Sequence, residues 1–494
     1  MTEQRGDPRH LDTLDRDLAR FSKLEIATNM VARPTVGIGI SIVFVTLAGV
    51  AAMLLFGQES NTLIVVLAAC LGAYMALNIG ANDVANNMGP AVGANALSMG
   101  GAIAIAVIFE SAGALIAGGD VVSTIAKGII EPQSMGTASI FIWAMMAALL
   151  SAALWVNLAT WFGAPVSTTH SVVGGVMGAG IAAAGFAAVN WPTMGKIAAS
   201  WVISPLLGGA IAAFFLAFIK SRIIYREDKI SAARVWVPVL VGIMAGAFAS
   251  YLALKGLKKV IKIDLPMALM IGAAIGGLVW LAMIPIIRKQ SAGLENRNKS
   301  LKVLFGIPLV VSAALLSFAH GANDVANAVG PLAAIVQASQ SGDFIQAVSL
   351  PFWVMVIGAF GISFGLFLFG PKLIRMVGGQ ITKLNPVRAY CVALSAAITV
   401  IVASWLGLPV SSTHIAVGAV FGVGFYREWD AERRIRKARI AMPNRAQFSP
   451  EERRRRKLVR RSHFMTIIAA WVITVPAAAI LSGSIFYLIS LVMG

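Results

Sequence analysis

Long apolar runs separated by short polar segments dominate the sequence. Runs such as 36–56, 138–162 and 193–219 match or exceed the roughly 20 residues that a helix needs to cross a bilayer. Of the 494 residues, 58% are hydrophobic and 13% are charged, whereas about 25% of an average soluble domain is charged. This pattern predicts an all-α polytopic membrane protein with about 12 transmembrane segments.

One seven-residue string occurs twice within this apolar pattern. The string GANDVAN fills positions 80–86 and 321–327, and Gly-Pro follows both copies. A carboxylate and two amides at membrane depth are costly unless they have partners. Gly, Asn and Pro crowd residues 78–95, which predicts a broken helix with its main chain facing a cavity. We therefore interpret each string as half of a binding site built by an internal repeat, rather than as a polar loop.

A second string is also duplicated, as PVSTTH at 165–170 and PVSSTH at 409–414. Proline suits the first turn of a helix and Ser or Thr caps it, so each string predicts a half-helix that starts within the membrane. Free N–H groups and the positive dipole end at such a start favour an anion. The alternative is packing, with hydroxyls bonded back to their own helix. Six hydroxyls suit a tetrahedral oxyanion, and its candidate ligands are Ser167, Thr168, Thr169, Ser411, Ser412 and Thr413.

The basic loops predict the topology. If the N-terminus is cytosolic and each run crosses once, the loops 220–234, 288–302, 372–388 and 427–463 all lie inside, and these are the most basic loops. The runs before the two GANDVAN strings then point in opposite directions, so the sequence predicts an inverted-topology repeat with an extracytoplasmic C-terminus. The expected units are the N-terminal segment 1–35, an extra span 36–61, the first repeat 62–219, linker spans 220–302, the second repeat 303–425, a basic cytosolic loop 426–463 that holds Arg453–Lys457, and a last span 464–494.

The motif acids Asp83 and Asp324 would repel a bare anion. They are compatible with an anion if cations bridge the two, or if the anion carries a proton to donate. Carboxylate, amide and backbone oxygens are hard ligands suited to ions such as Na⁺ or Mg²⁺. The asparagines can donate N–H to an anion or accept a cation through oxygen. The sequence predicts anion contacts at Asn86 and Asn327, and a cation site, with Na⁺ as one candidate, at Asn82, Asp83, Asn323 and Asp324.

Other titratable residues in the apolar runs have less support from the repeat. Glu110 is a coupling or gating candidate, or else a buried support, and Gly358 is nearest to it in register. His170 and His414 close the Ser/Thr strings, and a neutral hydrogen-bonded role is favoured over titration. His320 is matched by Ile79, so symmetry gives it no support.

The remaining composition excludes some classes. Cys70 and Cys391 are interpreted as packing residues, since two cysteines in apolar runs indicate neither a disulfide framework nor a metal site. The net charge of +18 comes mostly from loops between spans, so it indicates membrane orientation and not nucleic-acid binding.

The paired strings resemble those of the inorganic phosphate transporter (PiT) family of sodium- or proton-coupled phosphate permeases. The resemblance covers about 62–425 and the last span. It implies a helical inverted-repeat symporter that imports phosphate with Na⁺ or H⁺, and some relatives carry sulfate instead. The family's acids, asparagines, hydroxyls and intramembrane glutamate fall on the residues named above. A second acid that some members have before the later hydroxyl string is replaced here by Val392-Ala393-Leu394.

The sequence thus favours a transporter, and not an enzyme, in a bacterial inner (plasma) membrane. An intramembrane serine hydrolase using Ser167 or Ser411 is disfavoured because each serine lies only three residues from its histidine. An anion channel would not need buried acids. No cofactor is expected beyond the coupling ion. The expected partners are phosphate, arsenate as its analogue and the lipid bilayer, and a homodimer is compatible with the sequence.

Overall fold

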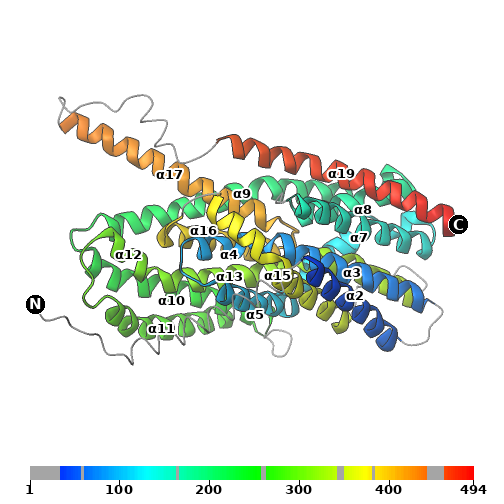
Figure 1. Cartoon of the computed structure of the whole chain (residues 1–494), viewed down its shortest axis with the longest axis horizontal. Helices are drawn as coiled ribbons and strands as arrows, with labels where there is room; N and C mark the ends of the chain where they lie inside the picture. The colour runs from blue at the N-terminus through cyan, green and yellow to red at the C-terminus, as the bar shows by residue number, and fades with distance from the viewer. Residues whose placement is uncertain are drawn as a thin grey trace, which may run out of the picture.

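The computed structural model describes residues 34–56, 61–162, 166–256, 263–341, 350–380, 384–441 and 461–493. Most of the segment 1–35, Pro165, the arginine-rich stretch 453–457 and Gly494 lie outside them, so the expectations for these residues stay predictions. Helices run mostly along the long axis of the molecule (Figure 1), and within the described residues there is no strand, only an isolated bridge between Ile130 and Val189. The predicted all-α membrane architecture is confirmed.

The helices of the first half and of the linker are α2 (Pro34–Phe56), α3 (Thr62–Asn82), α4 (Val84–Gly93), α5 (Met99–Ala117), α6 (Gly119–Ser123), α7 (Ala138–Trp161), α8 (Thr168–Ala184), α9 (Trp191–Ile219), α10 (Lys229–Lys255), α11 (Leu265–Gln290) and α12 (Asn298–Leu304). The second half holds α13 (Gly306–Asp324), α14 (Ala326–Ser341), α15 (Phe352–Gln380), α16 (Pro386–Trp405), α17 (Ser412–Ala441) and α19 (Arg461–Met493). Short π- and 3₁₀-helical turns connect α6 to α7 (Thr124–Gly128, Pro132–Met135) and α8 to α9 (Phe186–Ala188).

Eleven helices in the described part are long and apolar enough to cross a membrane, against about 12 expected. Two helices that the sequence analysis counted as crossings are not among these eleven. They are α8 and α17, which start at the Ser/Thr strings. With 17 residues, α8 is short for a crossing, and α17 carries charges in its second half. Because α17 continues to Ala441, the first part of the expected loop 426–463 is helical.

Both GANDVAN strings break their helix at the acid. The helix α3 ends at Asn82 and α4 starts at Val84, while α13 ends at Asp324 and α14 starts at Ala326. The glycine of the first string allows another helix to pack closely beside the break. Gly80 packs against the carbonyl of Ile362 on α15, and a side chain at this position would collide with that backbone.

Two helical hairpins carry the Ser/Thr strings. In the first, formed by α7 and α8, the backbone N–H of Glu131 donates to the carbonyl of Ala188 at 2.9 Å. The outer ends of α7 and α8 are therefore adjacent, and Val166 and Ser167, which lead into α8, are buried. The second hairpin is α16–α17. The starts of α8 and α17 meet inside the protein, where Thr169 Oγ1 donates to the carbonyl of Val410 at 3.0 Å.

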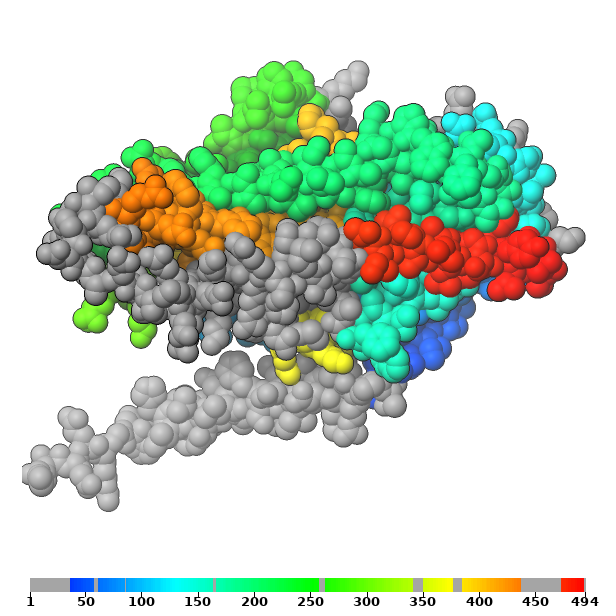
Figure 2. All heavy atoms as spheres, turned by 90° about the horizontal axis from the view of Figure 1, so that it is seen from above, coloured from blue at the N-terminus to red at the C-terminus, as the bar shows by residue number. Residues whose placement is uncertain are grey.

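Each hairpin packs against a long helix of the other half of the chain. Glycines of α8 lie against the backbone of α19, and glycines of α17 lie against the backbone of α9, with the same four-residue spacing in both cases. Figure 2 shows α9, α17 and α19 on one face of the molecule. The glycines and their backbone partners are Gly174 with Val475, Gly178 with Ala479, Gly418 with Pro205, and Gly422 with Gly209.

Three of the four basic loops meet at one end of the molecule. The backbone N–H of Lys229 donates to Asn296 Oδ1 at 2.9 Å, which joins 220–234 to 288–302. Lys220 Nζ lies 2.8 Å from Asp430 Oδ2, which joins the end of α9 to α17. These contacts agree with the prediction that the loops share one side of the membrane.

Candidate functional site

The carboxylate of Asp83 lies at the centre of the protein and is 2% exposed. Thr168 Oγ1 donates to its Oδ2 at 2.6 Å, and Thr413 Oγ1 donates to its Oδ1 at 3.0 Å. The two hydroxyls come from different hairpins, so Asp83 joins the start of α8 to the start of α17. Both threonines donate their hydroxyl protons to Asp83 and not to their own helices. The alternative in which the hydroxyls bond back to their own helix is therefore excluded for these two residues.

Asp324 occupies the equivalent place in the second half and is 1% exposed. Ser412 Oγ donates to its Oδ2 at 3.2 Å, as Thr168 does to Asp83. Oδ1 of Asp324 is buried and has no hydrogen-bond partner among the described residues. A buried carboxylate oxygen without a donor is costly, which makes it a candidate contact for a ligand.

The last asparagine of each string reaches into the other half of the chain. Asn86 Nδ2 donates to Thr413 Oγ1 at 2.9 Å, and Asn327 Nδ2 donates to Thr169 Oγ1 at 3.1 Å. The amide oxygen of Asn327 has no partner among the described residues. The two Ser/Thr strings and the two GANDVAN strings therefore lie together, as the sequence predicted.

The first asparagine of each string holds the hairpin of its own half. Asn82 Nδ2 donates to Thr160 Oγ1 on α7 at 2.8 Å, and Asn323 Nδ2 donates to Ser404 Oγ on α16 at 3.0 Å. Asn323 Oδ1 also accepts the backbone N–H of Val410 at 3.3 Å. These contacts fix the hairpin turns beside the acids.

Ser167 and Ser411 act as N-caps. Ser167 Oγ accepts the backbone N–H of His170 at 3.1 Å, and Ser411 Oγ accepts that of His414 at 3.3 Å. Capping satisfies one free N–H at each buried helix start. The rings of His170 and His414 lie 4.4 Å apart, centroid to centroid, and that of His170 lies 3.8 Å from Trp201.

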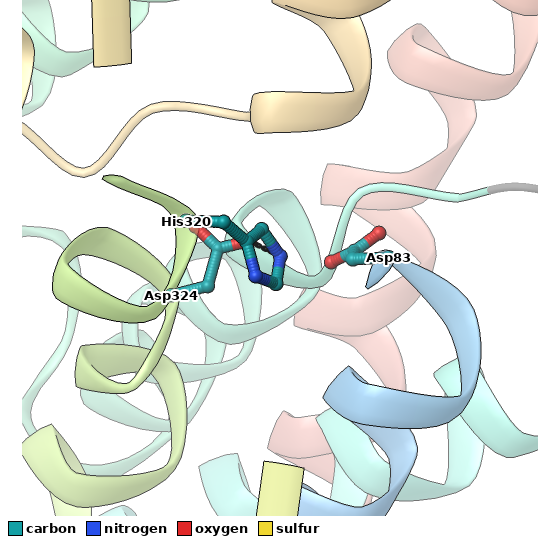
Figure 3. A group of neighbouring side chains, drawn as sticks. All are labelled: Asp83, His320 and Asp324. Carbon is teal, nitrogen blue, oxygen red and sulfur yellow. Dashed lines mark ion pairs between the residues drawn. The ribbon is translucent and has the colours of Figure 1, made fainter. Parts of the chain in front are cut away.

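His320 belongs to the site, although symmetry gave it no support. Its Nε2 lies 2.8 Å from Asp324 Oδ2, and its Nδ1 lies 3.1 Å from Glu110 Oε2. Figure 3 shows Asp83, His320 and Asp324 pointing toward one another from α3 and α13. The available sequence signal was spacing, because His320 precedes Asp324 by one helical turn.

The expected register for Glu110 was wrong by one helical turn. Gly321 packs against the backbone of Glu110, and its equivalent in the first string, Gly80, packs against the backbone of Ile362. Glu110 therefore corresponds to Ile362, not to Gly358. The segment before α15 is longer than the one before α5, which sequence spacing alone did not reveal.

The site offers ligands for a cation beside donors for an anion. An atom from each of Asp83, His320 and Asp324 lies within 4.8 Å of the others, all three residues being buried. With one proton in each of the two short contacts of His320, the residues Glu110, His320 and Asp324 together carry one negative charge, and Asp83 adds another when ionised. A bare anion would be repelled, so cations or an anion-borne proton are needed.

Comparisons with known proteins identify the family of the chain. The signature of the phosphate transporter family matches residues 79–482. A candidate phosphate permease of Helicobacter pylori (strain J99) is 53% identical over 83% of this chain and 78% of its own length. One from Pyrococcus abyssi is 36% identical over 85% of this chain and 97% of its own length.

A solved structure described as the sodium-dependent phosphate transporter is similar throughout. It is 34% identical, the TM-score is 0.78, and the match covers 87% of this chain and all of that one. The family consists of transporters and not of enzymes, which removes the serine hydrolase alternative. From the match over most of its length, the chain belongs to the phosphate transporter family.

Proposed function

We propose that the protein is a secondary active symporter that imports inorganic phosphate together with Na⁺ or H⁺. The observation that carries this proposal is the pairing of Asp83 with hydroxyls from both hairpins. A tetrahedral oxyanion needs several donors from different directions, and a buried acid beside them needs a cation or a proton. The same site therefore suits an anion and a cation that enter together.

The phosphate ligands in this proposal are the hydroxyls at the starts of α8 and α17 with Asn86 and Asn327. The coupling ion would use the carboxylates. Asp324 Oδ1 and Asn327 Oδ1 are buried oxygens without a described partner, which supports a hard cation or a protonated phosphate oxygen beside them. The sodium dependence in the name of the similar solved structure favours Na⁺ over H⁺.

The two halves would act as an inverted-topology repeat. This is supported by contacts that occur twice, such as those of Asn82 with Thr160 and of Asn323 with Ser404. Because the α7–α8 and α16–α17 hairpins meet at the site, movement of one or the other would open it to one side at a time.

Orientation follows from the basic end of the molecule. We place that end in the cytosol of a bacterium with the protein in its inner membrane, and the end of α19 outside. A cysteine appended after Gly494 should react with impermeant reagents in intact cells, while one in 427–463 should react only after lysis. The opposite labelling pattern would overturn this orientation.

The function is tested by uptake of labelled phosphate into proteoliposomes, with Na⁺ and pH gradients imposed separately. Accumulation driven by one gradient identifies the coupling ion. Equilibration without accumulation under both gradients would indicate a channel and contradict the proposal.

Competition by other anions tests the substrate. Phosphate keeps a proton near neutral pH, and a buried aspartate can accept its hydrogen bond, which is about twice as strong as a neutral one. Sulfate has no such proton. Excess arsenate should therefore suppress uptake, and sulfate should act weakly. Equal competition by sulfate would favour a sulfate permease of the same family.

A further inference from the structure

Three buried polar residues of the site have no polar counterpart in the other half of the chain. The register of the two GANDVAN strings pairs His320 with Ile79 and Asn87 with Ala328. The packing of Gly321 on the backbone of Glu110, and of Gly80 on the backbone of Ile362, pairs Glu110 with Ile362. Several other contacts of the site occur in both halves, such as those of Asn86 with Thr413 and of Asn327 with Thr169, so these three differences are departures from a repeated frame.

The three residues converge on one motif acid. Asn87 Nδ2 donates to Glu110 Oε1 at 3.1 Å, Glu110 Oε2 lies 3.1 Å from His320 Nδ1, and His320 Nε2 lies 2.8 Å from Asp324 Oδ2. All four side chains are at most 1% exposed. They form a continuous chain of polar contacts from α4 through α5 to α13.

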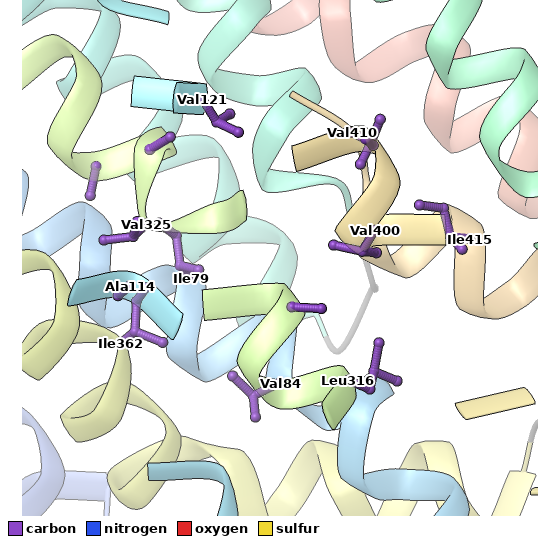
Figure 4. Close-up of a cluster of buried hydrophobic side chains, with 14 of the residues drawn as sticks. Ile79, Val84, Ala114, Val121, Leu316, Val325, Ile362, Val400, Val410 and Ile415 are labelled. Carbon is purple, nitrogen blue, oxygen red and sulfur yellow. The ribbon is translucent and has the colours of Figure 1, made fainter. Parts of the chain in front are cut away.

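The equivalent place beside Asp83 is apolar. Ile79 and Ile362 are buried members of the hydrophobic core (Figure 4). Among the described residues, the side chain of Asp83 is hydrogen-bonded by two hydroxyls, whereas Asp324 has an imidazole on the oxygen that also accepts Ser412. The buried chain of contacts therefore reaches Asp324 and has no counterpart beside Asp83 in that part of the protein.

We propose that Asn87, Glu110 and His320 are positioning residues that fix the Asp324 carboxylate, so that the two acids act as unequal ligands. The proposal rests on the phosphate symport function above. The locked Asp324 presents its Oδ1 in one fixed place and so sets the affinity for phosphate. Asp83 is the acid that rearranges when ligands enter and leave.

The duplicated chain supplies its own test. The triple variant Asn87→Ala/Glu110→Ile/His320→Ile copies the apolar arrangement that the protein already holds beside Asp83. Replacing a whole buried ionic group by apolar residues is often tolerated, whereas removing one partner leaves a buried charge. The triple variant should therefore reach the membrane folded, while His320→Ile alone should yield less folded protein.

Two measurements compare the variants with the wild type. In proteoliposome uptake, the triple variant should raise the KM for phosphate about tenfold or more, as expected when a bond to a charged group is lost, with a much smaller change in turnover. Binding of inorganic phosphate to the purified protein should weaken by a similar factor. Asn87→Ala removes only the far end of the chain of contacts and should raise KM by a smaller factor, about threefold.

The control is Ile79→Val/Ile362→Val, which changes packing at the same depth beside Asp83 and should leave KM unchanged. An unchanged KM in both the triple variant and Asn87→Ala would overturn the positioning role. If KM also rose in the control, packing and not positioning would explain the effect. A wild type that neither binds nor accumulates phosphate would instead refute the proposed function.

Discussion

The surroundings of Asp83 and Asp324 share a frame and differ in what holds the carboxylate. Each acid ends a helix, accepts a hydroxyl from the hairpin of its own half, and lies beside an asparagine that crosses to the other half. Within the described part of the chain, only Asp83 also accepts a hydroxyl from the opposite hairpin, through Thr413, and only Asp324 is paired with an imidazole. The matching contacts thus define the fold of the site, and the unmatched contacts place the two carboxylates in different surroundings.

Removing the charge of Asp83 should have the largest effect. Asp83→Asn keeps the shape but cannot balance a cation, and its amide N–H would face hydroxyl donors. We expect phosphate uptake to fall about 100-fold or more with the protein still in the membrane. Asp324→Asn should also abolish uptake, and in addition it disturbs His320, so less folded protein is expected. Uptake like that of the wild type in either variant would contradict the assignment.

The glycines of the two strings should respond alike, because their packing matches. In Gly80→Ala the added methyl meets the carbonyl of Ile362, and in Gly321→Ala it meets that of Glu110. Separating the helices should cost about 1–3 kcal/mol or more. Thermal unfolding in detergent measures this, with Gly100→Ala as the control, since nothing lies within 4 Å of the position of its added carbon. Unequal losses of thermal stability in Gly80→Ala and Gly321→Ala would contradict the equivalent packing of the two glycines.

Thr413 and Thr169 occupy equivalent positions of the two Ser/Thr strings, but their substitutions should differ in effect because only the acceptor of Thr413 is a carboxylate. Thr413→Val removes the donor to Asp83 Oδ1, whereas Thr169→Val removes a donor to a neutral carbonyl. We expect phosphate affinity to fall about tenfold for Thr413→Val and about fivefold for Thr169→Val, since bonds to charged groups contribute more. Uptake kinetics measure both. Unchanged kinetics in both variants would refute a site built from two helix starts.

The sequence predicted the frame because its signals are local. Duplicated strings and a cap before each half-helix act through nearby backbone, so a broken helix at the GANDVAN string and the caps at Ser167 and Ser411 were predicted. The chain from Asn87 to His320 joins three helices, and no spacing rule connects it. Symmetry even argued against His320, because the signal there is a departure from the repeat.

Backbone contacts hold the outer end of the α7–α8 hairpin, whereas side-chain contacts hold the end of α17. This difference gives the smallest expected effect, a change of stability with pH. The ends of α7–α8 are joined by backbone hydrogen bonds, such as that from Asn190 N–H to the carbonyl of Ile129 at 2.9 Å. Beyond the apolar part of α17, Asp430 accepts Lys220 at 2.8 Å and the hydroxyl of Tyr225. The Asp430 contacts join α17 to the end of α9. Backbone bonds do not titrate, so of these two sets of contacts the set at Asp430 should depend on pH.

Burial alone would raise the pKa of Asp430, but the hydrogen bonds from Lys220 and Tyr225 hold that pKa below its ordinary value. A carboxyl whose pKa is lower in the folded state stabilises the fold above its unfolded pKa of about 3.9, and this contribution is lost as the pH falls through the folded value. The variant Asp430→Asn lacks this contribution. Its unfolding temperature in detergent should therefore lie below that of the wild type at about pH 6, and the gap should shrink as the pH falls below the unfolded pKa of about 3.9 and on through the folded value. A gap that persists at low pH would show that the tie depends on shape and not on charge.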